Sequence, residues 1–435
     1  MIYKVKASLI FYIYIILLLF VIIGVIIFTK LPNPIALKTE FYVWQRAWIP
    51  ETQASIVRAV EYANGFMILA GEIDVKEKHL NFSPIHIKWE ALSIPRISVT
   101  LVFRIRTPVS SFLSDNKIKK VGTFLTKHFN KIIKEAHSKG VQIVGVQLDY
   151  DCPTSRLTDY RKLLTYLITH HPKWIWSITT LPTWLSHADF KKLVARLNYF
   201  VLQVYTFERP EQLGDDIAIV HTTQVYNYIK QVSNIKTPYY LALPTYGYAV
   251  IFDEYGRFVG LEAETPSHQW PPTYSIKEVM SQPAEIVPII TRLKAYHPKS
   301  MLGIVWFRLP VDGDIHNWSW STLVAVMNGE LPLITYQAEV RKSHNGLYDV
   351  WVTNAKDSDY LGRIDITIKQ TGCRIVAKDT LRGFSKKVSQ NGSIHILTGK
   401  LPTPSEQVMV AWYNVDCKNT ENTKPFKITN IKALQ

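Results

Sequence analysis

Apolar, strand-like runs alternate with amphipathic, helix-like stretches from Phe41 to about Gly329. The strand candidates begin near Phe41, Gly65, Pro95, Val141, Trp174, Asn198, Pro238 and Met301. The stretches 51–63, 117–140 and 157–171 between them have the spacing of amphipathic helices. Eight such strands with intervening helices predict a (β/α)8 barrel over residues 41–330. A doubly wound sheet is the alternative, but neither G-x-G-x-x-G nor G-x-x-x-x-G-K-[ST] occurs.

The pattern changes after Glu330. Runs at 346–354, 362–370, 393–399 and 407–415 alternate polar and apolar residues, and turn residues separate them. This pattern predicts a β-sandwich-like domain over residues 331–435. Cys373 and Cys417 both lie in it, where an exported domain would pair them and a reducing compartment would leave two buried thiols.

The N-terminus carries an uncharged run, Leu9–Phe28, that is long enough to cross a bilayer as a helix. Lys4 and Lys6 precede it, which favours a cytoplasmic N-terminus, although Lys30 and Lys38 follow it. We expect a signal anchor over residues 1–30 and a linker over residues 31–40, with the rest of the chain periplasmic or extracellular. A cleaved signal peptide and a buried core helix are the alternatives.

The net charge of +15 is spread along the chain. Its densest clusters, such as 117-KIKK-120, are short and lack the interleaved aromatic residues of an RNA-binding sheet. We therefore expect no nucleic-acid partner. Two interpretations of the charge remain. One is a solvated basic surface, and the other is attraction to anionic envelope polymers or lipid headgroups.

The stretch 145-GVQLDYDCP-153 ends an apolar run on two aspartates. Successive strand residues point to opposite faces, and Val144, Val146, Leu148 and Tyr150 form the apolar set that would pack beneath helices. The other set, Gln147, Asp149 and Asp151, is then predicted to point into the barrel and to end at its C-terminal rim. Active sites of this fold lie at that rim.

The same alternation predicts which side chains of other strands face the lumen. In 66–74, Met67, Leu69 and Ile73 are assigned to the helix side, so that Ala70, Glu72 and Asp74 point inward. In 97–106 the inward residues are Arg104 and Arg106. In 199–208 they are Gln203 and Tyr205, with Glu208 beyond the strand end, and in 301–310 they are Trp306 and Arg308.

Two carboxylates that face a sugar can hydrolyse a glycosidic bond, one as acid and the other as nucleophile or base. The catalytic candidates are Asp149, Asp151 and Glu208. The substrate-binding candidates are Glu72, Arg104, Gln147, Tyr205, Trp306 and Arg308. Flat apolar platforms for sugar rings are expected from Trp44, Trp48, Trp184, Trp306 and Trp318. The structural alternatives are an Arg104–Asp149 ion pair that only holds the barrel, a core role for Trp306 and a solvated loop acid at Glu208.

Other chemistries find little support in the sequence. Cys152 has no histidine positioned by sequence to activate it, and His170-His171 lacks metal-ligand spacing. The segment 312-DGD-314 is typical of a turn, and neither G-x-S-x-G nor H-E-x-x-H occurs. We therefore predict no metal and no cofactor.

Three segments of the barrel resemble an uncharacterised bacterial domain-of-unknown-function family of the DUF3142 type. They are 41-FYVWQRAW-48, 147-QLDYDCPTSRLTDYRKLL-164 and 303-GIVWFRLP-310. The resemblance implies an exported TIM barrel distantly similar to glycoside hydrolases, without an established activity. The fourth strand is also similar to the chitinase-type D-x-D-x-E run, but Pro153 stands where the proton-donating Glu would be. Substrate-assisted chitinase chemistry is therefore not supported, and the acid would have to be Asp151, Glu208 or Glu72.

The sequence thus predicts a membrane-anchored, envelope-facing barrel that binds a glycan and uses rim carboxylates if it hydrolyses it. A catalytically inert glycan-binding protein and a scaffold whose β-sandwich docks a partner are the alternatives. We expect Arg104 to depress the pKa of one aspartate and the other, Asp151, to be the better proton donor.

Overall fold

The computed structural model describes residues 37–206, 208–263, 269–333, 335–355, 363–389, 393–397, 406–417 and 424–434. The run Leu9–Phe28, and with it the predicted membrane-spanning helix, lies outside the described residues. Within the described ranges, every helix is too short or too polar to cross a bilayer.

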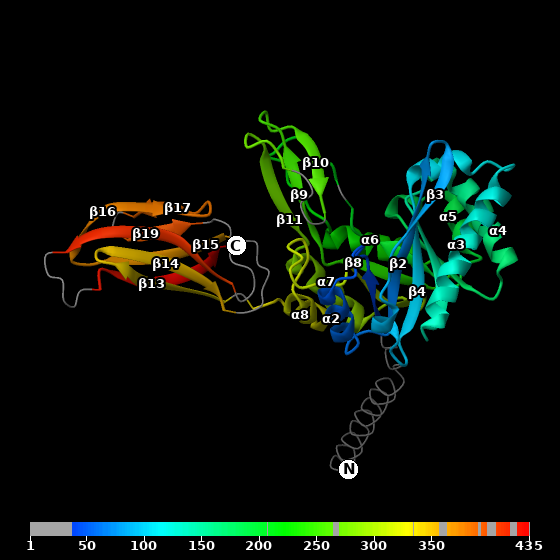
Figure 1. The fold of residues 1–435 in the computed structure, drawn as a ribbon, viewed down its shortest axis with the longest axis horizontal. Helices are drawn as coiled ribbons and strands as arrows, with labels where there is room; N and C mark the ends of the chain where they lie inside the picture. Colours follow the sequence, from blue (N-terminus) through cyan, green and yellow to red (C-terminus); the bar gives the residue numbers. More distant parts are fainter. Residues whose placement is uncertain are drawn as a thin grey trace, which may run out of the picture.

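Eight parallel strands close into a barrel, which confirms the predicted (β/α)8 architecture (Figure 1). The strands follow the order β1-β12-β8-β7-β6-β5-β4-β2, and pairing of β1 with β2 closes the ring. Their bounds are β1 (Lys38–Val43), β2 (Gly65–Lys76), β4 (Ser98–Ile105), β5 (Ile143–Tyr150), β6 (Ile175–Thr180), β7 (Phe200–Gln203), β8 (Tyr239–Pro244) and β12 (Met301–Phe307). Because the strands are parallel, all their C-terminal ends meet at one mouth.

Helices cover the outside of the barrel. They are α2 (Pro50–Ala59), α3 (Ile118–Ser138), α4 (Leu157–His170), α5 (Ala188–Val194), α6 (Thr222–Val232), α7 (Pro283–Ala295) and α8 (Trp320–Asn328). In α3, Val121, Leu125, Phe129, Ile132 and Ala136 are buried at the three- and four-residue spacing of an amphipathic helix. After β2, the strand β3 (His79–Pro84) and the 3-10 helix η1 (Trp89–Leu92) take the place of an α-helix. Further 3-10 helices are η2 (Thr107–Phe112), η3 (Thr154–Arg156) and η4 (Pro182–Trp184).

The last barrel helix, α8, has sequence signals at both ends. The hydroxyl of Ser319 accepts a hydrogen bond from the backbone N–H of Thr322, which caps the N-terminus. Gly329 follows the helix with φ of 82°, a left-handed conformation that favours glycine and ends the helix. The barrel therefore ends next to the predicted boundary at residue 330.

A three-stranded antiparallel sheet is inserted after β8 and projects from the mouth side of the barrel (Figure 1). Its strands are β9 (Gly247–Phe252), β10 (Phe258–Glu262) and β11 (Ser275–Met280), with β9 in the middle. Tyr248, Val250 and Phe252 of β9 pack in a cluster of their own with Ile217 and Ile219. The insertion thereby builds a wall beside the mouth.

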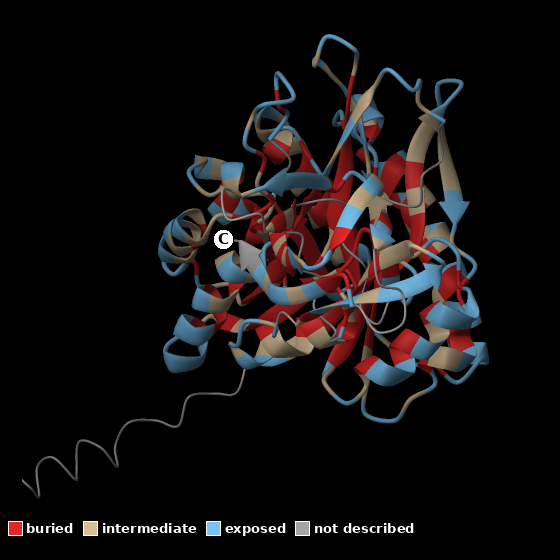
Figure 2. Cartoon of the chain, turned by 90° about the vertical axis from the view of Figure 1, so that its left-hand side faces the viewer, coloured by how far each residue is buried: buried red, intermediate tan, exposed pale blue. Residues whose placement is uncertain are grey.

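The barrel has two layers of buried side chains, one beneath the helices and one in the lumen. Figure 2 shows the buried residues concentrated in the interior of the molecule. The helix-side layer includes Val146, Leu148 and Tyr150 of β5, and Leu101 and Phe103 of β4, as predicted from their alternation. On β2 the predicted sides of Met67, Leu69 and Ala70 are wrong.

On β2, Met67 and Leu69 lie in the lumen cluster, whereas Ala70 packs beneath the helices. Both faces of this strand are apolar, so alternation does not distinguish them. A register shift between Leu69 and Gly71 against β4 then changes the parity, which is why Ile73 lies on the helix side as predicted.

The C-terminal part forms two four-stranded antiparallel sheets around one apolar core, the predicted β-sandwich. One sheet contains β13 (Tyr336–His344), β14 (Leu347–Asn354), β19 (Gln407–Cys417) and β16 (Cys373–Thr380). The other contains β17 (Ser385–Val388), β18 (Ile394–Leu397), β15 (Arg363–Gln370) and β20 (Phe426–Leu434). Cys373 and Cys417 are opposite each other on β16 and β19 and form a disulfide with Cα atoms 4.4 Å apart. Of the two alternatives left open by the sequence, the structure has the disulfide and not two free thiols.

Candidate functional site

A pocket of about 390 Å³ opens at the C-terminal mouth of the barrel. Its size falls within the range of small-molecule sites. Its lining combines carboxylates, guanidinium groups, hydroxyls and aromatic rings from most of the strands. The lining residues are Tyr42, Trp44, Arg104, Asp149, Asp151, Thr179, Leu181, Gln203, Tyr205, Thr206, Tyr246, Ala263, Phe307 and Arg308.

Asp149 lies near the C-terminal end of β5 and is only 5% exposed. The hydroxyl of Thr179 on β6 donates a hydrogen bond of 2.6 Å to its Oδ1, and Nε of Arg104 on β4 lies 3.8 Å from its Oδ2. Burial and the neighbouring charge of Asp151 nevertheless raise the pKa of Asp149 to about 6, because they outweigh Arg104 and Thr179. The predicted ion pair is present, but the pKa of its carboxylate moves in the opposite direction from the prediction.

Asp151 follows the end of β5 and is exposed at the pocket surface. Among the described residues it has no hydrogen-bond or ion-pair partner. Because its charge is the second-largest cause of the raised pKa of Asp149, the two carboxylates interact. The pocket therefore combines one desolvated carboxylate in its wall with one accessible carboxylate beside it.

Arg104 and Trp44 form one side of the pocket. The guanidinium carbon of Arg104 lies 5.8 Å from the ring centroid of Trp44, a cation–π geometry. Trp44 is 6% exposed and packs edge-on against Phe307, with ring centroids 5.2 Å apart. Arg104 is thus oriented from one side by an indole and from the other by the carboxylate of Asp149.

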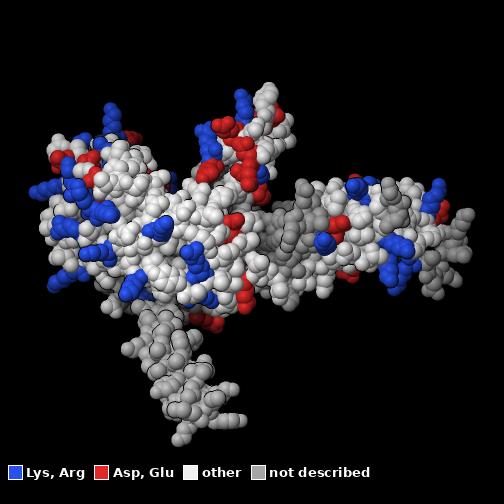
Figure 3. Space-filling model, turned by 180° about the vertical axis from the view of Figure 1, so that it is seen from behind, with Lys and Arg blue, Asp and Glu red and all other residues white. Residues whose placement is uncertain are grey.

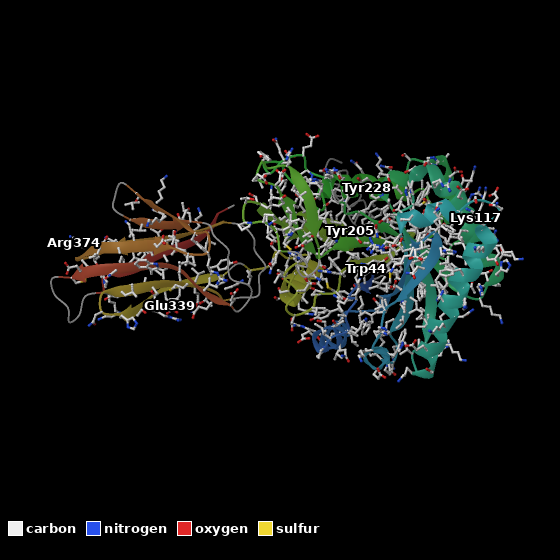
Figure 4. All side chains as sticks on the ribbon, turned by 45° about the horizontal axis from the view of Figure 1, so that its top comes forward. Trp44, Lys117, Tyr205, Tyr228, Glu339 and Arg374 are labelled. Carbon is white, nitrogen blue, oxygen red and sulfur yellow. A yellow bond between two sulfur atoms is a disulfide. The ribbon has the colours of Figure 1, made fainter. Side chains whose placement is uncertain are left out.

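An aromatic cluster around Phe307 continues from Trp44 along the pocket. The ring of Tyr205 stacks on that of Phe307 at 5.4 Å, and Tyr246 meets Phe307 edge-on at 5.3 Å. Figure 4 labels Trp44 and Tyr205, which lie close to each other in the middle of the barrel domain. The hydroxyl of Tyr205 is buried without a hydrogen-bond partner in the described part of the chain.

Arg308 borders the pocket immediately after β12. Its guanidinium lies 2.8 Å from Oδ2 of Asp314, and it donates to the backbone oxygen of Ala263 at 3.1 Å. The peptide bond between Phe307 and Arg308 is cis. Arg308 is 6% exposed, so its charge is largely matched within the protein rather than by solvent.

Gln147 lies one step deeper on β5 and does not line the pocket. It accepts a hydrogen bond of 2.7 Å from the hydroxyl of Tyr42 and donates one of 3.3 Å to Ser177. Below it, Tyr240 donates to the buried carboxylate of Glu40 at 2.7 Å, and burial raises the pKa of Glu40. These polar groups form the floor that supports Asp149.

Two other predicted acids lie outside the pocket lining. Glu72 is bound by Arg46 and by Arg106, whose Nη2 lies 2.9 Å away. Partial burial raises the pKa of Glu72, but the hydrogen bonds and charges of the two arginines lower it further, so its pKa is below the ordinary value. Glu208 is exposed beyond the end of β7 and does not line the pocket either. A solvent-exposed loop acid describes it best.

Of the five predicted tryptophan platforms, only Trp44 lines the pocket. Trp306, Trp184 and Trp318 are at most 2% exposed and pack in the core beneath the helices, and Trp48 is also in that layer. The prediction for Trp306 is wrong because 304-IVWF-307 is apolar on both faces. Phe307, its neighbour, is the residue that faces the mouth.

Several pocket residues were not singled out by sequence. Tyr42 lies in the apolar run of β1, Thr179 in β6, and Tyr246 just before the inserted sheet. Their positions depend on which strands become neighbours, and the tertiary fold decides this. Metal ligation finds no support in the described ranges, where no three His, Cys, Asp or Glu side chains are grouped to hold an ion.

Residues 115–312 match the model of a domain of unknown function, DUF3142. This match confirms the resemblance inferred from the sequence. It covers most of the barrel, including β5 with both aspartates, and stops just after Arg308.

Solved structures with a similar arrangement include a spore cortex-lytic enzyme, SleL, of Bacillus megaterium QM B1551. It has a TM-score of 0.49 and 14% identity over 65% of this chain and 72% of that one. A chitinase of Chromobacterium violaceum ATCC 12472 has a TM-score of 0.48 and 13% identity over 68% of this chain and 99% of that one. No curated protein matches the chain. At identities this low, function has to be inferred from the site itself.

Proposed function

We propose that the chain is a membrane-anchored, envelope-facing barrel that binds a glycan at its mouth and cleaves it with Asp149 and Asp151. The observation that carries this proposal is the pairing of a buried carboxylate, Asp149, with an accessible one, Asp151, in a pocket that also has aromatic walls. Sugar rings present apolar faces and many hydroxyls, and this pocket offers aromatic surface together with hydrogen-bonding groups.

The two aspartates are suited to different roles. Asp151 reaches the pocket surface and is placed to contact a glycosidic oxygen. Asp149 lies in the wall and holds a proton up to a pH of about 6. Removing a proton from this pair brings two negative charges together in a desolvated wall, so the pair retains a proton more readily than an exposed aspartate. We infer that Asp149 holds the proton below about pH 6 and that Asp151, at the pocket surface, relays it to the glycosidic oxygen.

Membrane attachment is the second part of this proposal. It rests on the uncharged run Leu9–Phe28, with Lys4 and Lys6 before it. It is supported by the disulfide between Cys373 and Cys417, because such bonds persist mainly outside the cytosol. An alkaline-phosphatase fusion at about residue 330 should be active, whereas an inactive fusion contradicts export.

The test of catalysis uses the full chain in detergent. Wild type is first screened for binding to neutral, N-acetylated and anionic envelope glycans, and the bound glycans are then analysed for cleavage products. Asp151→Asn should abolish cleavage and retain binding, whereas Asp312→Asn, at an exposed aspartate outside the pocket, should leave both unchanged. Failure of wild type to bind any glycan overturns the proposal.

An inert glycan-binding protein is the second candidate, and two specific observations favour it. Pro153 occupies the place of the acid in the chitinase-type run, and Asp149 and Asp151 are the only carboxylates that line the pocket in the described part of the chain. The acid and the nucleophile or base of a hydrolase would then both have to come from the end of β5, on the same side of a bound sugar. Binding without any released product, by wild type and Asp151→Asn alike, would support this second function.

A further inference from the structure

The end of the barrel opposite the pocket carries a ring of positive charge. Eight segments lead into the eight barrel strands, and because the strands are parallel all eight segments lie at the same face. Seven of them bring an exposed Lys or Arg to this face. These residues are Lys38, Arg96, Lys139, Lys173, Arg196, Lys236 and Lys299.

Fewer acidic groups lie at this end. They are Glu61 in the segment into β2, Glu90, whose Oε1 lies 3.2 Å from Nζ of Lys139, Glu135 near the end of α3, and Glu330 just after α8. The other six basic residues form no ion pair with any residue that the structure describes. Side chains of this kind are free to meet an external anionic surface.

A hollow of about 740 Å³ lies beside this face between the ends of α6 and α7. Its lining includes Lys230, Lys236, Arg292 and Lys299 and no carboxylate. Arg292 lies over the ring of Tyr226 at 4.4 Å. The hollow continues the basic ring along one side and could receive an anionic headgroup.

The mouth side has the opposite character. Asp253, Glu254, Glu262 and Glu278 outnumber Arg257 and Lys277 on or beside the inserted three-stranded sheet, and Figure 3 shows groups of both signs on this projection. The barrel therefore has a basic end and an acidic projection at the other end. A charge distribution of this kind orients a protein on an anionic surface with its basic end down.

The length of the N-terminal segment is compatible with such contact. Nine residues, 29–37, separate Phe28, at the end of the apolar run, from Lys38. Even fully extended they span at most about 35 Å. The basic face is also the face at which the chain enters the barrel, because Lys38 is the first residue of β1.

We propose that this basic face, defined by the seven residues of the ring, docks on the anionic phospholipid headgroups of the bilayer that anchors the chain. The proposal rests on the membrane anchoring argued above and goes beyond it, since it specifies which face meets the membrane. The pocket then points away from the bilayer, toward envelope polymers.

The experiment places the full chain in vesicles with a fluorophore on one introduced cysteine. Gln142→Cys reports on the basic face, and Tyr255→Cys reports on the exposed projection, where Tyr255 is 74% exposed. Cys152 is buried and the other two cysteines are bridged, so labelling is specific. A quencher attached to the lipid headgroup measures proximity in phosphatidylcholine vesicles with and without 30% phosphatidylglycerol.

We expect phosphatidylglycerol to increase quenching at residue 142 and not at residue 255, and about 0.5 M salt to remove the increase. Replacing Lys173, Lys236 and Lys299 by Gln should weaken the contact by about fivefold per cation. The matched control replaces Lys119, Lys127 and Lys131, exposed on α3, and should have no effect.

Equal quenching in both vesicle types, or equal loss in the control variant, overturns the proposal. Flotation of the chain with pure phosphatidylcholine vesicles at high salt separately tests the anchor, because no anionic lipid is present. A failed anchor and a failed docking face are therefore distinguishable.

Discussion

The barrel and the β-sandwich differ in what their interiors contain. The sandwich core is formed by aliphatic and aromatic side chains from both sheets, such as Ile366, Val410 and Tyr413. The barrel lumen buries Glu40, Gln147 and Asp149, each with hydrogen-bond partners from other strands. Buried polar groups need partners, so they specify geometry at an energetic cost that apolar packing avoids. The comparison shows that buried polar groups are concentrated in the barrel, whereas the sandwich core is built from apolar packing.

The largest expected effect is on turnover. Asp151→Asn should reduce glycan cleavage by about 100- to 10,000-fold, the usual contribution of a general acid, because an amide has no proton to donate at this position. Binding should change little. The matched sandwich variant, Asp379→Asn at an exposed position, should leave cleavage unchanged. Unaltered turnover in Asp151→Asn would remove this carboxylate from the mechanism.

The second prediction concerns the sandwich alone. Replacing Cys373 and Cys417 together by Ser opens a loop closed over 44 residues and should lower the free energy of unfolding of this domain by about 4 kcal/mol, on a chain-entropy estimate. Glycan binding by the barrel should persist. Chemical unfolding followed by domain-specific proteolysis measures the two domains separately, and loss of binding in this variant would contradict their independence.

The third prediction uses the pKa of Asp149, which burial raises to about 6 from an ordinary value of 3.8. Between these values the folded protein holds a proton that the unfolded chain has lost. This proton stabilises the folded state. Its contribution to the free energy of unfolding is fully present below about pH 4 and is lost as the pH rises through 6, by at most about 3 kcal/mol. Asp149→Asn should therefore flatten the decline of stability between pH 4.5 and 7.5.

Denaturant unfolding at several pH values measures this difference, with exposed Asp312→Asn as the control. Breaking a fully buried ion pair costs about 3–5 kcal/mol, but a smaller loss is expected for Asp149→Asn. Arg104 has a side chain 29% exposed and a separation of 3.8 Å from Asp149, so its charge remains solvated when the carboxylate is removed. A parallel decline in wild type and Asp149→Asn would contradict the assignment.

The smallest expected effect is on affinity. Trp44→Leu removes the indole that packs against Arg104 and Phe307, and should weaken glycan binding by about tenfold, equivalent to about 1.4 kcal/mol. Trp184→Phe is a useful comparison, since Trp184 is fully buried and outside the pocket. It should change stability more than affinity. Equal losses of affinity in both variants would point to a general disturbance of the barrel.

The alternation of residues was sufficient to predict lumen side chains only where one face of a strand is polar. On β5 and β7 it correctly separated Asp149 and Gln203 from the apolar set. On β2 and β12 both faces are apolar, and the assignments of Met67 and Trp306 were wrong. In a closed barrel both sides of a strand can be buried, so hydrophobicity alone does not identify the inward side.

The sequence by itself determined the eight barrel strands, the sandwich pattern and the position of two aspartates at a strand end, because these depend on local periodicity. Only the tertiary structure decided that Thr179 and Arg104 contact Asp149, that Arg46 and Arg106 bind Glu72, and that Cys373 pairs with Cys417. It also reversed the expected pKa shift of Asp149. A pKa depends on the sum of burial and charges brought together from several strands, and that sum exists only once the barrel has closed.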